Sequence, residues 1–412
     1  MGADASPCAD PDISLDKIYY IDDMADKSGE KGQIFLSDYI ASKLRKYQSI
    51  LIPVYEQANS AAIKFQKSHT FWIMVFILSS TIAVILALLQ LYEPIRIGFG
   101  LYILAAEGMI LGIGIFAIVN DMRFGKYHKK WIIERHRAER CRFLKFYDLL
   151  INDDAYFDQE IIIIKKITDF SPINLWIRDH GQNPDIIKKF IDKNNASHIG
   201  DIFNYFMCRR LFVQMNYFLK RHHENREKKE LWTKKLPLFL ISIAFSVAFF
   251  HIGWEIFQGL DLKGSSLLSI VGITLIFLAI TLPIVVWTLN SFSTIFSYKA
   301  NAGRYAGIYI SVKDCLNKEL FRNKGYETEE MKEEITNNDH GKKRIIGDIN
   351  VQTESQYLKD LIIKFCVHPR DFSPTTLNLS SKDIFQGLLC LEDQLEREHE
   401  EWIRLTTDAI SL

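Results

Sequence analysis

Four long runs of apolar residues leave this chain few folds to adopt. The runs lie between the charged residues Lys67 and Glu93, Arg96 and Asp121, Lys235 and Glu255, and Lys263 and Lys299. Tyrosines aside, the only ionisable side chains inside them are His69, Glu107 and His251. A helix needs about 20 apolar residues to cross a hydrocarbon core about 30 Å thick, and each run reaches or approaches that length. Because buried helices of soluble proteins rarely stay free of charge for so long, the runs predict four transmembrane helices rather than a large soluble core.

We therefore expect an all-α integral membrane protein whose four transmembrane helices form two hairpins, extended by cytoplasmic helices. Its segments are an N-terminal cytoplasmic segment (1–54), a first transmembrane hairpin (55–123), a cytoplasmic helical linker (124–235), a second transmembrane hairpin (236–300) and a C-terminal cytoplasmic helical region (301–412). Within the last, residues 325–344 are highly charged and poor in apolar side chains, which predicts a mobile linker. Almost nothing protrudes on the far side of the membrane, so a receptor ectodomain is excluded.

The distribution of lysine and arginine predicts the orientation of these segments. Both cations are frequent before the first run, around the central segment and after the fourth run, whereas the connecting loops offer only Arg96 and Lys263. By the positive-inside rule, both termini and the central segment face the cytoplasm. No cleavable signal peptide is evident, so we expect the first run to direct its own insertion. All six cysteines then lie on the reducing side and are expected to be free thiols.

The sequence of the segment after the second run predicts a basic helix. "HKKWIIERHRAERCRFLKFYDLL" mixes large apolar side chains with many cations and contains neither Gly nor Pro. It is expected to continue as a helix out of the membrane. Its basic face could bind anionic lipid headgroups at about 1 kcal/mol per charge. The simpler interpretation is that these cations set the orientation of the chain in the membrane and that this helix face is solvated. We favour it over a specific lipid or nucleic-acid site.

Signals of catalysis and of metal binding are scarce. The sequence has no phosphate-binding loop, no dinucleotide fingerprint, no H-E-x-x-H and no G-x-S-x-G. His222 and His223 lie in a basic segment that repels metal ions, and Cys366 with His368 lacks the two further ligands of a closed zinc site. We therefore expect no enzymatic activity, no metal and no cofactor.

Three short motifs carry a resemblance to a known family. "WIIERHRAERCRFLKF", with Trp131, Arg137 and Glu139, resembles the W…R…AE signature that follows a transmembrane hairpin in the SLATT family, the SMODS- and SLOG-associated transmembrane effectors of bacterial conflict systems. "FVQMNYFLKRHHENREKKELWTKK" is similar to the helix that enters the second hairpin of the four-span members. There the matching residues are Gln214, Tyr217 and Phe218. "REHEEWIRL", with Glu401 and Trp402, resembles their closing segment.

The resemblance covers roughly residues 55 to 412 and implies a function. It implies a membrane effector of a bacterial antiphage system that oligomerises and forms a pore or disrupts the inner membrane on a nucleotide-linked signal. The roughly 50 residues before the likeness are too few for the fused SLOG sensor of four-span members. The sensing or nucleotide-producing partner is therefore a separate protein, or the signal binds the cytoplasmic helices of this chain. A constitutive ion channel or small-solute transporter, and a membrane scaffold for cytoplasmic partners, remain as alternatives.

Glu107 is the most informative polar residue of the four runs, because an ionised carboxylate near the bilayer centre costs several kcal/mol. Three placements follow from the sequence. Glu107 donates a hydrogen bond, as a neutral acid, to another helix, or it pairs with a polar group such as His251, or it lines a path through an oligomer. Gly108 and Gly112 have the small-x-x-x-small spacing that permits close helix contact.

Overall fold

The chain is entirely helical wherever the structure describes it. The computed structural model describes residues 38–90, 93–122, 126–167, 196–259, 266–295, 298–319, 350–362 and 380–408. Its elements are α2 (Asp38–Gln90), α3 (Glu93–Met122), α4 (Lys126–Ile151), α5 (Asp154–Lys166), α8 (Ala196–Phe206), the π-helix η1 (Met207–Leu211), α9 (Phe212–Glu230), the π-helix η2 (Leu231–Lys235), α10 (Leu236–Gly259), α11 (Ser266–Ile295), α12 (Tyr298–Glu319), α14 (Val351–Ile362) and α15 (Ser381–Asp408). These ranges contain no strand, so the all-α prediction is confirmed for them. The expected mobile linker at 325–344 lies outside the described residues.

Three of the helical stretches are long and apolar enough to cross a membrane. They are Asp38–Gln90, Ile97–Ala117 and the continuous stretch His198–Phe250, which runs from α8 into α10. In α11 the apolar stretch found among the described residues is shorter, at Phe277–Ser293. The described helices therefore support the expectation of a membrane protein.

The chain forms two compact units. Unit 1 contains residues 1–63, 130–222 and 303–412, and unit 2 contains residues 64–129 and 223–302. The chain passes from unit 1 into unit 2 inside α2 and again inside α9, so single helices belong to both units. Unit 2 holds the apolar runs, and unit 1 holds most of the charged helices.

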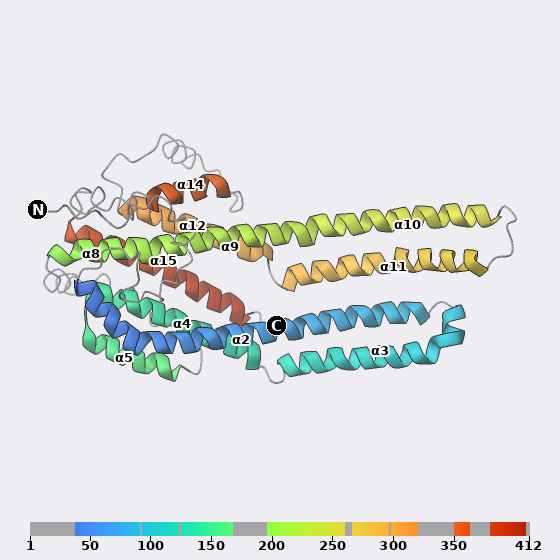
Figure 1. Ribbon diagram of the computed structural model, residues 1–412, viewed down its shortest axis with the longest axis horizontal. Coiled ribbons are helices and arrows are strands. Elements are labelled where there is room, and N and C mark those ends of the chain that lie inside the picture. Colours follow the sequence, from blue (N-terminus) through green and yellow to red (C-terminus); the bar gives the residue numbers. More distant parts are fainter. Residues whose placement is uncertain are drawn as a thin grey trace, which may run out of the picture. The chain divides into compact units, whose positions relative to one another are not determined.

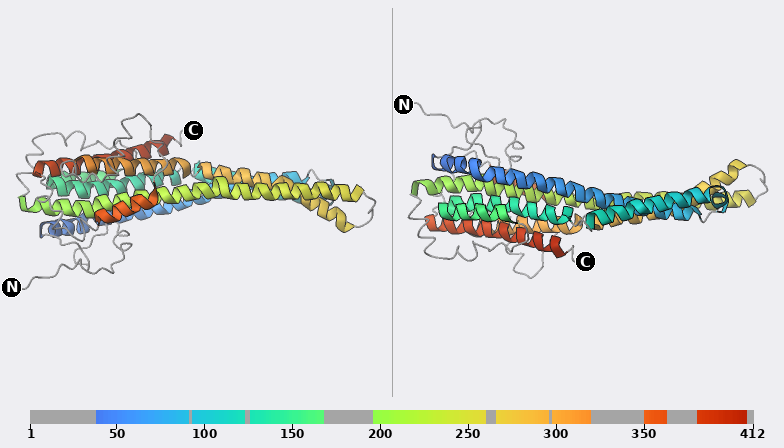
Figure 2. Two further views of the ribbon diagram at one scale, coloured as in Figure 1. Left: turned by 90° about the horizontal axis from the view of Figure 1, so that it is seen from above. Right: turned by 90° about the horizontal axis from the view of Figure 1, so that it is seen from below.

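In unit 2 the helices pack in pairs. Figure 1 and Figure 2 show α3 beside the C-terminal half of α2, and α11 beside α10. The α2–α3 pair is antiparallel, because Trp72 packs edge-on against Phe116 at 5.8 Å between ring centroids, while Gln90 bonds Glu107. The helices expose large apolar side chains, with Leu101 78% exposed.

Unit 1 is a helical bundle with one large apolar core. The first part of α2, the helices α4, α5, α8, α9, α12, α14 and α15, and the π-helix η1 all contribute buried side chains. Aromatic residues such as Phe146, Phe157, Phe203 and Phe385 are fully enclosed. Cys141, Cys315 and Cys390 are not disulfide-bonded, and the first two are buried. The expectation of free thiols is wrong for Cys208, which is disulfide-bonded.

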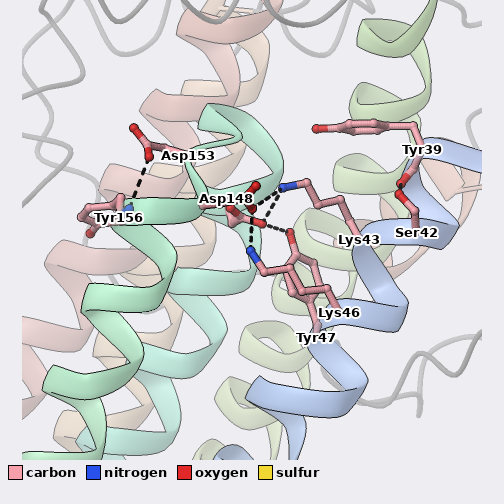
Figure 3. Close-up of polar contacts among 9 residues, drawn as sticks. Tyr39, Ser42, Lys43, Lys46, Tyr47, Asp148, Asp153 and Tyr156 are labelled. Atoms are coloured by element: carbon pink, nitrogen blue, oxygen red, sulfur yellow. Dashed lines mark hydrogen bonds and ion pairs between the residues drawn. The ribbon is translucent and has the colours of Figure 1, made fainter.

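The turn from α4 to α5 follows from two polar residues. Asn152 adopts φ 53°, in the left-handed region that asparagine tolerates better than most residues. Asp153 then caps α5, since its carboxylate accepts a hydrogen bond from the backbone N–H of Tyr156 (Figure 3). This turn sets α5 against the bundle, where Phe157, Ile161 and Ile164 are buried.

A buried ion pair joins α2 to α4 close to this turn. In Figure 3, Lys43 and Tyr47 point at Asp148, whose side chain is fully buried. Lys43 Nζ lies 3.1 Å from Asp148 Oδ2, and the Tyr47 hydroxyl donates to the same oxygen at 2.7 Å. Burial and the Asp148 carboxylate raise the pKa of Tyr47 well above its usual value, so this hydroxyl remains a donor. Lys46 also pairs with Asp154 at 2.6 Å, but that carboxylate is 73% exposed.

We predict that Asp148→Asn lowers the free energy of unfolding by about 3 kcal/mol, because removing one partner of a buried pair leaves the other charge poorly compensated. Lys46→Met is the matched control and should change stability by less than about 1 kcal/mol, since its partner is solvated. Thermal or denaturant unfolding of the purified protein measures both. Equal losses in the two variants would contradict the distinction.

Candidate functional site

Within the apolar runs, the Glu107 carboxyl group is tied to a neighbouring helix. The side-chain amide of Gln90 donates a hydrogen bond to Glu107 Oε2 at 2.7 Å, and the Glu107 side chain is half-buried in the protomer. Gln90 is the last residue of α2. The antiparallel register therefore brings the middle of the apolar stretch Ile97–Ala117 opposite the end of α2. A hydrogen bond to another helix was one of the three placements expected for Glu107, although here the amide is the donor.

The glycine that allows close approach of α3 to α2 is Gly114. A Cβ atom added there would lie 2.6 Å from Ser79 Oγ, a distance that forces a neighbour to move. At Gly108 and Gly112, an added Cβ would meet no atom within 4 Å. The two glycines expected at a helix contact are thus open in the protomer, and Gly114 is the one that makes the close approach. The side chain of His251, the other polar candidate, lies outside the described residues.

A hydroxyl pair links α2 to α11. Thr81 Oγ1 and Thr288 Oγ1 are 2.9 Å apart, and each oxygen also lies within hydrogen-bond distance of a carbonyl one turn earlier in its own helix. Because a hydroxyl has a single proton, one threonine donates to its own backbone and the other donates across to it. Hydroxyls that bond their own backbone are tolerated inside a membrane because no polar group is left unpaired. Sequence reasoning missed this pair, since threonines are common and only the fold reveals which ones face each other.

The tryptophans of the family motifs meet in unit 1. Trp131 of α4 packs edge-on against Trp402 of α15 with centroids 5.9 Å apart, and Trp402 stacks on His399 at 5.7 Å. His399 stacks in turn on His136 of α4, at 5.4 Å and an interplanar angle of 8°. The first and last motifs of the resemblance thus form one aromatic column between α4 and α15.

The remaining motif residues take part in contacts around this column. Arg137 binds Glu134 and donates to the backbone carbonyl of Ile167 at 2.6 Å. Glu139 accepts from Arg135 and Arg142. Tyr217 packs edge-on against Tyr305 at 6.1 Å. Gln214 is half-buried in α9. The contacts of Arg137 with Ile167 and of Tyr217 with Tyr305 join separate elements of the bundle, whereas the ion pairs of Glu139 lie within α4.

The two histidines of the column form a buried hydrogen-bonded pair. His136 Nδ1 lies 3.1 Å from His399 Nε2, so one ring donates and the other accepts. His136 Nε2 is buried without a hydrogen-bond partner in the described part of the chain. An unpaired lone pair is cheaper to bury than an unpaired N–H, so we assign the proton of His136 to Nδ1. Burial, together with repulsion between the rings, lowers the pKa of His136 to about 3, and burial lowers that of His399 to about 4.

The part of α15 that precedes His399 carries buried acidic side chains. Arg210 of η1 donates to the two carboxylate oxygens of Glu392 through Nε and Nη2, at 2.7 and 3.1 Å. Its guanidinium lies over Phe143 and Phe146. Tyr147 donates to Glu396 at 2.9 Å. Burial raises the pKa of Glu396 to about 8 and that of Glu398 to about 7. The Glu396 carboxyl is therefore mostly neutral at pH 7.

The described residues offer no constellation that resembles a catalytic or metal site. Among them, no group of three or more His, Cys, Asp or Glu side chains is placed to hold a metal ion. In comparisons with family models, curated proteins and solved structures, no match to this chain was found. The candidate functional features are thus the interhelical polar contacts of unit 2 and the α4–α15 column of unit 1.

The histidine pair predicts a pH dependence of stability. Both folded-state pKa values lie below the unfolded value of about 6.5, so below pH 6.5 the unfolded chain binds more protons than the folded one. The pair's contribution therefore falls as the pH drops from about 6.5 to about 4, by up to about 1.4 kcal/mol per pH unit for each histidine. We expect the double variant His136→Phe/His399→Phe, which keeps the stack, to lose this slope in denaturant unfolding between pH 4.5 and 6.5.

Glu396→Gln is a control in which the stability changes with pH in the opposite direction. Its folded-state pKa is raised, so its contribution is present below about pH 4.5 and is lost as the pH rises towards 8. Replacing it with the neutral amide should remove a decline in stability between pH 5 and 8. A parent and a double histidine variant with the same acid slope would contradict the assignment of the pair as neutral.

Proposed function

We propose that this chain is a four-span protein of the bacterial inner membrane, with two helical hairpins and both termini in the cytoplasm. The observation that carries this proposal is the apolar surface of unit 2. Ile97 and Leu101 are each 78% exposed and Phe249 is 74% exposed, on apolar stretches that contain few charged residues. Water would not stabilise such a surface, whereas lipid tails would. The fourth span is α11, which is 30 residues long.

The protein acts, in this proposal, as an effector that permeabilises the membrane once several copies assemble. The polar groups found between the helices of unit 2 bind each other, as Gln90 binds Glu107 and Thr81 binds Thr288. One protomer therefore offers few polar groups to line an aqueous path, and a pore requires copies arranged around an axis.

The signal reaches the effector through its cytoplasmic bundle. The resemblance to the SLATT effectors supports a nucleotide-linked signal from a separate sensing or nucleotide-producing protein. The contact between Trp131 and Trp402 adds support, because two motifs far apart in the chain form one structural element. A constitutive channel or transporter and a membrane scaffold are the competing functions.

The experiment compares the parent with two variants of Glu107 by growth of expressing cells and by ion flux in proteoliposomes. The parent should be toxic and leaky when activated. Glu107→Gln keeps a hydrogen-bonding oxygen for Gln90 but cannot ionise, so we expect normal expression with altered flux or ion selectivity. Glu107→Ala also loses the interhelical bond, worth about 1 kcal/mol, and should weaken packing as well.

The exposed neighbour Met109 provides the control, since Met109→Ala should behave as the parent does. A parent that conducts ions without harming cells favours the constitutive channel, and one that neither leaks nor harms cells favours the scaffold. If both Glu107 variants match the parent in assembly, flux and toxicity, Glu107 has no role in permeabilisation.

A further inference from the structure

Unit 2 carries basic side chains next to the ends of its apolar stretches. We call this set the basic collar, and it comprises Lys64, Lys67 and His69 of α2, His128 and Lys129 of α4, Lys228 and Lys229 of α9, and Lys234 and Lys235 of η2. In the first hairpin, the rings of His69 and His128 stack at 4.5 Å, and Phe65 contacts Tyr127 at 6.4 Å. These two pairs hold α2 and the start of α4 together, so their basic residues lie on one local surface.

Aromatic pairs mark where the apolar surface begins beside the collar. Trp72 contacts both Phe71 and Phe116 in the first hairpin, and Trp232 of η2 contacts Phe292 of α11 at 6.4 Å. Tryptophan is enriched where hydrocarbon meets the headgroups. In α2, Lys64 and Lys67 precede Trp72 by about one to two turns. In the second hairpin, Lys234 and Lys235 lie two and three residues after Trp232. The collar therefore lies at the depth of the headgroups.

Four exposed lysines of the collar bind none of the residues that the structure describes. Lys64, Lys67, Lys228 and Lys234 are exposed, and within the described ranges no ion pair or hydrogen bond holds their ammonium groups. Lys235 is 3.9 Å from Glu230, a distance at the limit of an ion pair, and both side chains are solvated. A set of uncompensated ammonium groups next to an apolar surface matches a partner that combines a phosphate with acyl chains.

We propose that the basic collar binds anionic phospholipids of the bilayer that surrounds the protein, with the lysines at the phosphates and the aromatic pairs against the upper acyl chains. This inference rests on the membrane placement proposed above, but not on pore formation. The long lysine stems allow each ammonium group to reach the phosphate while the methylenes cover apolar surface. The partner is a lipid and not a free anion, because the collar adjoins the exposed apolar residues Phe71 and Leu238.

The test measures lipid binding to the full chain purified in neutral detergent. Phosphatidylglycerol and phosphatidylcholine are titrated separately, and native mass spectrometry counts the bound lipids. Each lysine near a headgroup phosphate contributes about a fivefold gain in affinity. We expect Lys228→Gln/Lys234→Gln to weaken phosphatidylglycerol binding by about 25-fold and to leave phosphatidylcholine binding unchanged. The matched control is Lys165→Gln/Lys166→Gln, which removes two exposed lysines of α5 in unit 1 and should have no effect.

Three outcomes would overturn the inference. The parent binds both lipids equally, or the control loses as much affinity as the collar variant, or inorganic phosphate displaces phosphatidylglycerol as well as the lipid itself does. The last outcome would indicate a site for a soluble anion. Because binding is measured without ion flux, selective lipid binding by a chain that never leaks would leave this inference standing and refute only the effector function.

Discussion

The structure depends on one constraint, the satisfaction of backbone polar groups where no water is present. Long runs that are almost free of charge can enter hydrocarbon as helices, because a helix bonds its own N–H and C=O groups. The few side-chain polar groups then follow the same rule. Ser79 bonds a carbonyl of its own helix, and the hydroxyls of Thr81 and Thr288 share their protons between each other and their own helices. Glu107 accepts a hydrogen bond from the amide of Gln90.

In the bundle of unit 1 the constraint is different, because helices rich in charged residues pack around one core and some of their charged side chains are buried. The side chains of Arg210 and Glu392 are almost fully buried, and so are those of Lys43 and Asp148. Such pairs add little stability over apolar residues of equal volume, but an unpaired member is strongly destabilising. We infer that they select one register of α2, α4, η1 and α15. Glu396 and the histidine pair differ from these ion pairs, because each of these buried groups is neutral.

The helical class and the apolar runs could be predicted from the sequence, because charge-free length is a local property. The sequence also singled out Trp131 and Trp402, which the fold brings together. Partners across helices could not be predicted, since they depend on register. Gly108 and Gly112 had the expected spacing, yet Gly114 makes the close contact, because Ser79 happens to lie opposite it. Likewise, nothing in the local sequence distinguishes Thr81 and Thr288 from other threonines, or His136 from the exposed His223.

The central claim is that the apolar surface of unit 2 faces lipid, and thiol labelling tests it most directly. Phe245→Cys and Phe249→Cys introduce thiols at positions of α10 that are 64% and 74% exposed in the protomer. Lys165→Cys introduces one on the exposed face of α5. A charged maleimide is added to leaky vesicles, and labelling of the parent's own cysteines is subtracted. The account predicts rapid labelling at position 165 and none at 245 and 249 until the protein is denatured. Equal labelling rates at all three positions would contradict it.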